Sequence, residues 1–285
     1  MSKTLSTVIA EAFDSEVKNA YQSSGKLKNT VTFRDATGNG IYKFRRRGKA
    51  IATPRVSQTD AQLADISNSL IPATIEEWEA NELTDIFDNA QVNFEEMRDL
   101  AEALMDATGR RNDQLIIDAM NTLHADSGSY ADTVAKTVGG NNAFNIGKLR
   151  AMASALDDKG VPEQDRTLLY TAAAKDQLLG TTEVTSGDYN TIRALVNGTI
   201  NTFMGFNFVL IETRDEGGLP LSTNDVTAFA YHKRAVGLAT ALTRSAVDWI
   251  PLKKGWLCAN DLAAGAVTIE AEGVVTATFD KTVSI

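Results

Sequence analysis

The sequence VNFEEMRDLAEALMDATGRRNDQLIIDAMNTLHA, from Val92 to Ala125, repeats apolar residues every three or four positions. That spacing predicts one face of a long α-helix. Asn93 is a suitable N-cap, and Glu96 three residues later completes a capping box. A helix of this length predicts a spine on which a sheet packs, with this apolar face: Phe94, Met97, Leu100, Ala101, Leu104, Ala107, Leu115, Ala119 and Leu123.

Gly109 lies inside this predicted spine helix. A glycine in a helix interior costs about 1 kcal/mol relative to alanine. Gly109 is therefore a position at which the helix can bend, and we expect Gly109→Ala to stabilise the helix by up to about 1 kcal/mol if it is regular there.

The composition is that of an ordinary globular protein. The chain has 285 residues, with 43% hydrophobic and 23% charged residues, so one or two domains are expected. The net charge of −9 argues against a general nucleic-acid binder. The single cysteine, Cys258, excludes an internal disulfide. No apolar run approaches the roughly 20 residues of a membrane span, and no signal peptide is recognisable, which predicts a cytosolic origin.

The beginning of the chain predicts an amphipathic helix. The segment TLSTVIAEAFDSEVKNAYQS, residues 4–23, has an apolar face that includes Leu5, Val8 and Phe13. This helix either docks on its own domain or forms an arm that packs on a neighbouring subunit, and the pattern does not distinguish the two.

A basic β-hairpin is predicted over residues 29–56. Strand-like residues precede and follow the turn sequence Thr37-Gly38-Asn39-Gly40. A hairpin is marginally stable alone, so another surface must cover it. A basic cluster can bind phosphate, but a solvated or protein-facing strand is the favoured interpretation of the charges on its return strand, Lys43, Arg45, Arg46, Arg47 and Lys49.

An acidic tract runs from the next segment into the spine helix. It lacks the glycine and the spacing of a calcium loop, and no histidine lies within it. A solvated or partner-facing acidic surface is therefore favoured over a metal or acid–base site. Its carboxylates are Glu76, Glu77, Glu79, Glu82, Asp85, Asp88, Glu95, Glu96, Asp99, Glu102 and Asp106.

The second half of the chain predicts shorter, mixed elements. Residues 126–142 are rich in Ser, Gly and Asn and predict a domain boundary, after which Asn145 caps a helix that extends to Leu156. RTLLYTAA and GFNFVLIET predict strands on either side of a short helix, AKDQLLG. The alternation in AGAVTIEAEGVVTATF predicts a closing hairpin with Gly273 in its turn.

The residues available for catalysis are few. His124 and His232 are distant in sequence, and neither forms a local motif with Cys258. No nucleotide-binding glycine motif, zinc-ligand spacing or nucleophile elbow is present. We expect no enzymatic activity, no cofactor and no metal site.

Three segments carry a resemblance to a known family. They are IEEWEANELTDIFDNAQVNFEEMRDLAEALMDATGRRNDQLIIDAM, TVGGNNAFNIGKLRAMASALDDKGVP and EVTSGDYNTIRALVNGTINTFMGFNFVLIETRDEGGLP. In that order they resemble the major capsid proteins of tailed phages. The resemblance implies the α+β Hong Kong 97 fold. It implies an N-terminal arm (1–28), an extended β-hairpin loop (29–56), a peripheral domain with the spine helix (57–142), an axial α/β domain (143–250) and C-terminal strands that return to the peripheral domain (251–285).

The same resemblance implies a structural protein of the virion. It implies self-assembly in the host cytoplasm into pentamers and hexamers of an icosahedral shell around double-stranded DNA. Portal, scaffolding and decoration proteins are the further partners, and no membrane is involved. An encapsulin-like compartment shell is the alternative within the fold, and a hydrolase using Cys258 is the alternative from another class. The expected intersubunit contacts are Leu5, Val8, Phe13, Lys43, Arg45, Arg46, Arg47, Lys49, Glu95, Asp99 and Glu102.

Overall fold

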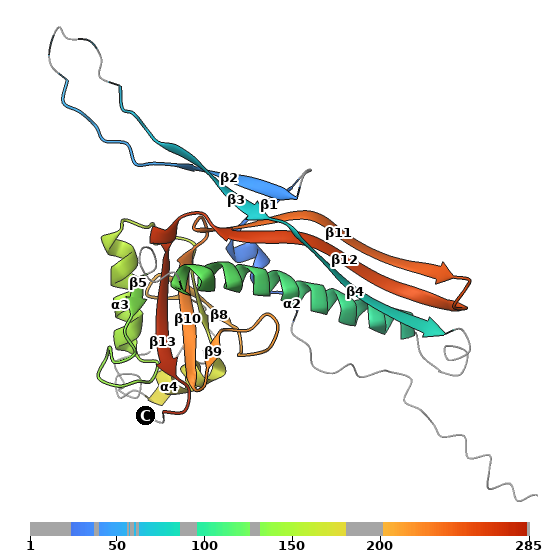
Figure 1. Ribbon diagram of the computed structural model, residues 1–285. Helices are drawn as coiled ribbons and strands as arrows, with labels where there is room; N and C mark the ends of the chain where they lie inside the picture. Colours follow the sequence, from blue (N-terminus) through green and yellow to red (C-terminus); the bar gives the residue numbers. More distant parts are fainter. Residues whose placement is uncertain are drawn as a thin grey trace, which may run out of the picture.

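The computed structural model describes residues 24–36, 40–55, 57, 60, 63–85, 96–125, 132–180 and 202–283. The predicted N-terminal helix, with Leu5, Val8 and Phe13, lies outside the described residues, as does Glu95 with the predicted helix cap. The described part of the chain forms an elongated body with a two-stranded ribbon that projects from it (Figure 1).

The predicted spine helix is confirmed as α2 (Glu96–Ala125). It lies along one face of a four-stranded sheet of order β1 (Thr32–Asp35), β11 (Val236–Ile250), β12 (Gly255–Thr268) and β4 (Glu76–Asp85) (Figure 1). The apolar face was predicted incompletely. Ile116, Ile117 and Met120 are fully buried, whereas the predicted Leu115 and Leu123 are only partly buried beside them.

A second sheet of seven strands packs beside the first. Its order is β5 (Asp132–Val134), β13 (Val274–Asp280), β10 (Asp225–His232), β6 (Arg166–Tyr170), β8 (Phe206–Leu210) and β7 (Thr202–Phe203), with β9 (Leu221–Ser222) paired to β10. Helices α3 (Ile146–Asp158) and α4 (Ala172–Gly180) belong to this half. The predicted cap of α3 is confirmed, because the Asn145 side chain accepts the Lys148 N–H at 2.9 Å.

Both sheets contribute to one continuous core. Leu238 and Leu262 of the first sheet belong to the same buried cluster as Phe229 and Val275 of the second. The predicted division at residues 126–142 therefore does not separate two hydrophobic cores, and strands β11 and β12 of the first sheet follow it in the sequence.

The predicted hairpin over residues 29–56 is wrong in its pairing. β1 pairs in parallel with β11, with Thr32 opposite Gly237. The basic strand β2 (Ile41–Arg47) instead pairs antiparallel with β3 (Asn68–Thr74), which includes Pro72. The partners of both strands lie far away in sequence, and residues 37–39 of the predicted turn lie outside the described residues.

The predicted closing hairpin around Gly273 is also wrong. β12 pairs with β11 and β4, whereas β13 pairs with β10 and β5 in the other sheet. A short 3₁₀ helix, η3 (Ala271–Gly273), connects them. The expected boundary between residues 250 and 251 does not coincide with the division between the sheets. β11, which precedes it, lies in the first sheet with α2, and β13, which follows it, lies in the second sheet. Alternating apolar and polar residues predict that a segment forms a strand, but they do not predict which other strand it pairs with.

No bend is needed to explain Gly109. The 30 residues of α2 form one continuous helix, and the backbone of Gly25 crosses it at Gly109. A Cβ at Gly109 would lie 2.8 Å from the Gly25 nitrogen, so glycine permits a close backbone approach. The expectation that alanine stabilises this position is therefore wrong.

The segment that crosses α2 is held by a buried carboxylate. Asp113, which is 2% exposed, accepts the backbone N–H groups of Lys26 and Leu27 at 2.8 and 2.9 Å. Burial raises the pKa of Asp113, and these two hydrogen bonds oppose that shift. Leu27 is completely buried in the core, so the chain is anchored between its crossing of α2 at Gly25 and the start of β1.

Candidate interaction surface

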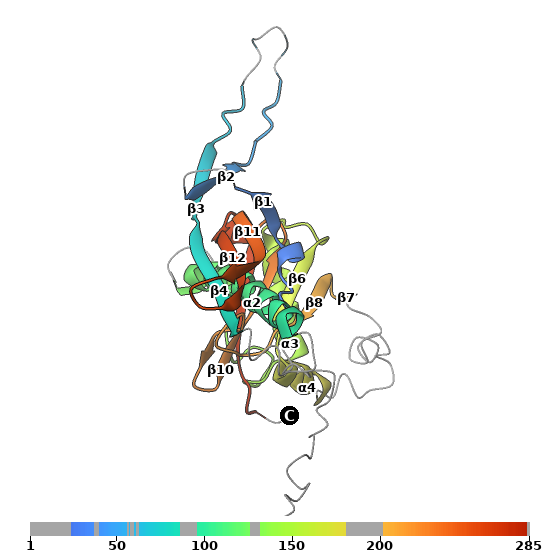
Figure 2. The ribbon, with the colours of Figure 1, turned by 90° about the vertical axis from the view of Figure 1, so that its right-hand side faces the viewer.

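The ribbon formed by β2 and β3 lies on the face of the first sheet opposite α2 (Figure 2). Phe44 is 5% exposed and packs so closely on Gly237 that a Cβ there would lie 2.6 Å from the ring. Gly265 likewise admits the backbone of Thr74. These two glycines let the base of the ribbon seat directly on the sheet, which supplies the covering that a two-stranded ribbon needs.

Two of the five predicted basic residues have partners within the chain. Arg46 donates to both carboxylate oxygens of Glu270, at 2.7 and 2.6 Å, and Lys49 pairs with Glu272 at 2.7 Å. The Lys49 hydrogen bond lowers the pKa of Glu272. Exposed pairs of this kind contribute at most about 1 kcal/mol. They attach the ribbon to the connection between β12 and β13, an association that sequence spacing did not reveal.

The other three basic residues form the outer face of the ribbon. Lys43, Arg45 and Arg47 are exposed, and within the described residues no carboxylate pairs with them. They alternate with Tyr42, Phe44 and Arg46, because successive side chains of a strand point to opposite faces. The strand therefore has an inner face that binds its own body and a basic outer face.

The described carboxylates of β4 lie at the edge of the first sheet that is opposite β1. β4 is an edge strand, and four of its carboxylates are exposed: Glu76, Glu77, Glu79 and Glu82. The start of α2 lies near the end of β4 and carries exposed Glu102 (Figure 1). The side chain of Asp99 lies outside the described residues. The structure thus brings the described carboxylates of β4 and α2 to one side of the body.

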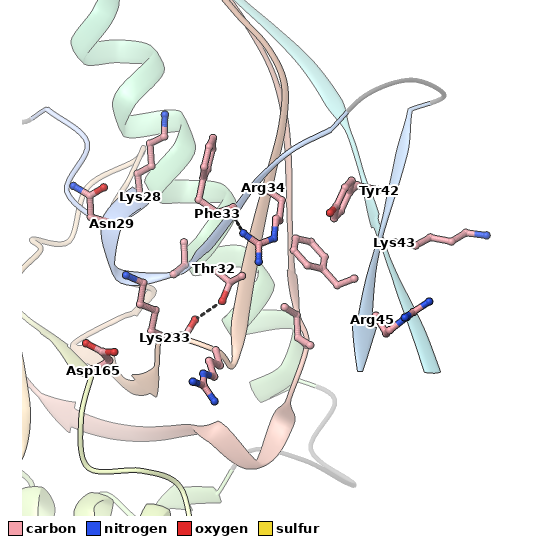
Figure 3. A pocket seen from close by; sticks show the side chains of 14 residues that line it. Lys28, Asn29, Thr32, Phe33, Arg34, Tyr42, Lys43, Arg45, Asp165 and Lys233 are labelled. Atoms are coloured by element: carbon pink, nitrogen blue, oxygen red, sulfur yellow. Dashed lines mark hydrogen bonds between the residues drawn. The ribbon is translucent and has the colours of Figure 1, made fainter. Parts of the chain in front are cut away.

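A basic hollow beside β1 was not predicted from the sequence. It has a volume of about 1000 Å³ and lies between β1, β2 and the turn from β10 to β11 (Figure 3). Its lining includes Lys28 and Arg34 from the beginning of the described chain and Lys233 and Arg234 from the turn. These residues are some 200 positions apart, and the parallel pairing of Thr32 with Gly237 brings them together. We call this site the basic hollow.

The geometry does not favour a cysteine hydrolase. Cys258 is 1% exposed and lines a small space beside Ala101 and Leu104 of α2. Nδ1 of His124 is 3.0 Å from the Thr276 hydroxyl, and Nδ1 of His232 accepts the Arg234 N–H at 3.2 Å. Burial lowers the pKa of His232. Both histidine rings are therefore engaged in structural hydrogen bonds.

Among the described residues, no group of three or more His, Cys, Asp or Glu side chains is arranged to hold a metal ion. In the same part of the chain, no helix is long and apolar enough to cross a membrane.

Comparisons with known proteins agree on one class. The family model described as "Phage capsid protein" matches residues 5–281. The capsid structure of cyanophage P-SCSP1u is similar at 13% identity with a TM-score of 0.74, over 95% of this chain and 93% of that one. Mycobacterium phage Che8 gives 16% identity and a TM-score of 0.67, over 97% and 98% of the two chains.

A capsid structure of Helicobacter pylori bacteriophage KHP30 is similar at 10% identity with a TM-score of 0.72, over 98% of this chain and 97% of that one. At such identities the likeness to solved structures shows the fold alone. No curated protein sequence matches the chain.

Proposed function

Since the chain belongs to the phage capsid protein family, we propose that its copies form the pentamers and hexamers of an icosahedral shell around double-stranded DNA. The Hong Kong 97-type fold predicted from the sequence is confirmed, and the protein is a capsid component of the virion. The proposal adds the symmetry of the shell, its DNA content and assembly in the host cytoplasm. Portal, scaffolding and decoration proteins are its further proposed partners.

The observation that carries the proposal is the separation of charge on one subunit. The outer face of the ribbon presents exposed Lys43, Arg45 and Arg47, whereas the exposed carboxylates lie on β4, the edge strand that follows β3, and on α2. Complementary surfaces at different places on one molecule make head-to-tail contacts, and these close into rings when the rotation permits. One chain can in this way supply both sides of every contact.

We further propose that this basic outer face contacts a neighbour's acidic surface, formed by Glu95, Asp99 and Glu102. Arg46 and Lys49 support the contact indirectly, because their intrachain pairs hold the ribbon in place. The apolar residues Leu5, Val8 and Phe13 are proposed to pack on a neighbouring subunit as part of an N-terminal arm.

Electron microscopy of the purified protein tests the function directly. Closed shells that contain DNA when isolated from infected cells support the proposal. Shells filled with a protein cargo and without DNA favour the compartment-shell alternative. A protein that stays monomeric under all assembly conditions contradicts both.

Charge reversal tests the ribbon contact. We expect the Lys43→Glu, Arg45→Glu, Arg47→Glu variant to lose assembly of empty shells, since like charges placed opposite one another cost several kcal/mol. Adding Glu95→Lys, Asp99→Lys and Glu102→Lys in the same chain is expected to restore part of it. Shell yield is measured by sedimentation and microscopy in the absence of DNA.

A matched control for that experiment is Arg150→Glu, because Arg150 is an exposed arginine on α3, away from the ribbon. This control should assemble like the wild-type protein. Normal empty shells from the ribbon variant that fail to retain DNA would contradict the intersubunit contact and favour binding of the genome by these residues.

A further inference from the structure

The basic hollow concentrates positive charge inside a concavity. Six basic residues and one acidic residue, Asp165, line it. The cations on its walls are Lys28, Arg34, Lys233 and Arg234, and Figure 3 shows Lys28 and Lys233 on the same side as Asp165. Lys43 and Arg45 project from β2 at the rim (Figure 3).

The contacts within the chain leave this charge largely unbalanced. The Lys28 ammonium lies 4.5 Å from the centre of the Phe33 ring, and Arg34 donates to the Phe33 carbonyl at 3.3 Å. Among the described residues, none of the four wall cations forms an ion pair with a carboxylate. A concave wall of one sign focuses the electrostatic field and attracts an oppositely charged ligand.

The position of β1 indicates which kind of anion fits. β1 and β4 are the two edge strands of the same four-stranded sheet. β1 is parallel to β11, and β4 is antiparallel to β12, which is antiparallel to β11, so β1 and β4 run in the same direction. One edge of the sheet is bordered by the basic hollow, and the other carries exposed Glu76, Glu77, Glu79 and Glu82.

We propose that the basic hollow binds the acidic strand β4 of a second copy of this chain. Edge strands offer unpaired backbone groups to another chain, and here their charges are complementary. The contact joins opposite edges of identical sheets, so it is head-to-tail and repeats from copy to copy. Recessed cations suit a strand with carboxylate side chains better than a duplex, whose phosphates lie on a convex surface.

This inference rests on the proposed assembly function and adds a second contact to it. Its carboxylates are those of β4, and the cations on the walls of the hollow are Lys28, Arg34, Lys233 and Arg234. Lys43 and Arg45 border both contacts, so the substitutions that test this one are confined to the wall residues and to β4.

The first experiment reverses charge on each side. The folded Arg34→Glu, Lys233→Glu variant is expected to reduce shell yield roughly tenfold or more, and Glu77→Lys with Glu79→Lys in the same chain is expected to restore it. The matched control, Arg150→Glu with Lys253→Glu, changes two exposed cations outside the hollow and should assemble normally. Circular dichroism confirms that each variant is folded.

Two outcomes overturn the proposal. Wild-type shell yield from the Arg34→Glu, Lys233→Glu variant overturns it, and if those shells lack DNA, the hollow binds nucleic acid instead. If the variant that combines all four substitutions is folded but still fails to assemble, β4 is excluded as the partner. In either case the wild-type protein still forms shells, so failure of this inference is distinct from failure of the proposed function.

A cross-linking experiment gives an independent answer in shells of nearly wild-type charge. Arg34→Cys with Glu79→Cys, treated with a bismaleimide after assembly, is expected to give a ladder of covalent multimers on a denaturing gel. Arg150→Cys with Glu79→Cys is the control, and the buried Cys258 is retained in both. A ladder no stronger than that of the control overturns the proposal.

Discussion

The Lys148→Met variant is expected to lose about 3 kcal/mol or more of its free energy of unfolding. The Lys148 side chain is 0% exposed, and its ammonium donates to the carbonyls of Val138, Asn141 and Ala143 at 3.0, 2.9 and 2.6 Å. Methionine fills a similar volume but leaves the Asn141 and Ala143 carbonyls without this donor, whereas the Val138 carbonyl still accepts from Asn145 Nδ2 at 3.1 Å. Each buried group left unsatisfied costs about 1–3 kcal/mol.

Urea unfolding of the unassembled subunit, followed by circular dichroism, measures this loss. Lys253→Met is the control, because Lys253 is exposed in the turn between β11 and β12, and its effect should stay within about 0.5 kcal/mol. A Lys148→Met variant as stable as this control would show that the ammonium does not hold the loop before α3.

The effect of Lys148→Met should also grow with pH. Burial lowers the pKa of Lys148 to about 8 from 10.5. Between these values the folded chain has released the proton while the unfolded chain still holds it, so wild-type stability rises with pH there. The difference between wild type and Lys148→Met is therefore expected to be larger at pH 9.5 than at pH 7. An unchanged difference would show that the burial cost is offset by the three carbonyls.

The Gly109→Ala variant is expected to be less stable than wild type by about 1–2 kcal/mol. Its added methyl group meets the Gly25 backbone, and overpacking costs about 1–3 kcal/mol. The better helix propensity of alanine returns up to about 1 kcal/mol of that loss. Calorimetry of the full-length chain measures the net change.

Removal of residues 1–25 should reverse the sign of this effect. Without Gly25 the obstruction is absent, and Gly109→Ala should then stabilise the truncated chain by up to about 1 kcal/mol. The untouched Lys26 and Leu27 still reach Asp113 in that background. Stabilisation by Gly109→Ala in the full-length chain as well would contradict the backbone crossing.

Local rules predicted the elements whose causes are local. The helical period of residues 92–125 and the side-chain cap at Asn145 depend on neighbours within a few positions, and both α2 and α3 form as expected. The same rules gave no warning about Gly109, because the group that requires a glycine there belongs to Gly25, which is 84 positions away.

Strand partners were the part that sequence could not supply. Phe33 lies opposite Leu238 and Val275 lies opposite Ala230, and alternation is satisfied by either a local or a distant partner. The basic hollow is invisible for the same reason, since Lys28 and Lys233 meet only after β1 has paired with β11. The exposed basic face of β2 was recognisable because it lies within one strand.

The ribbon is attached to the first sheet through its close contacts with Gly237 and Gly265. Phe44 and the Arg46–Glu270 pair hold β2 against the body, and the ribbon itself is only two strands wide. A two-stranded element deforms more easily than the close-packed core to which it is attached. In the proposed shell, fivefold and sixfold rings require different angles between neighbours, and we expect the ribbon to accommodate the difference while the shared core stays undeformed.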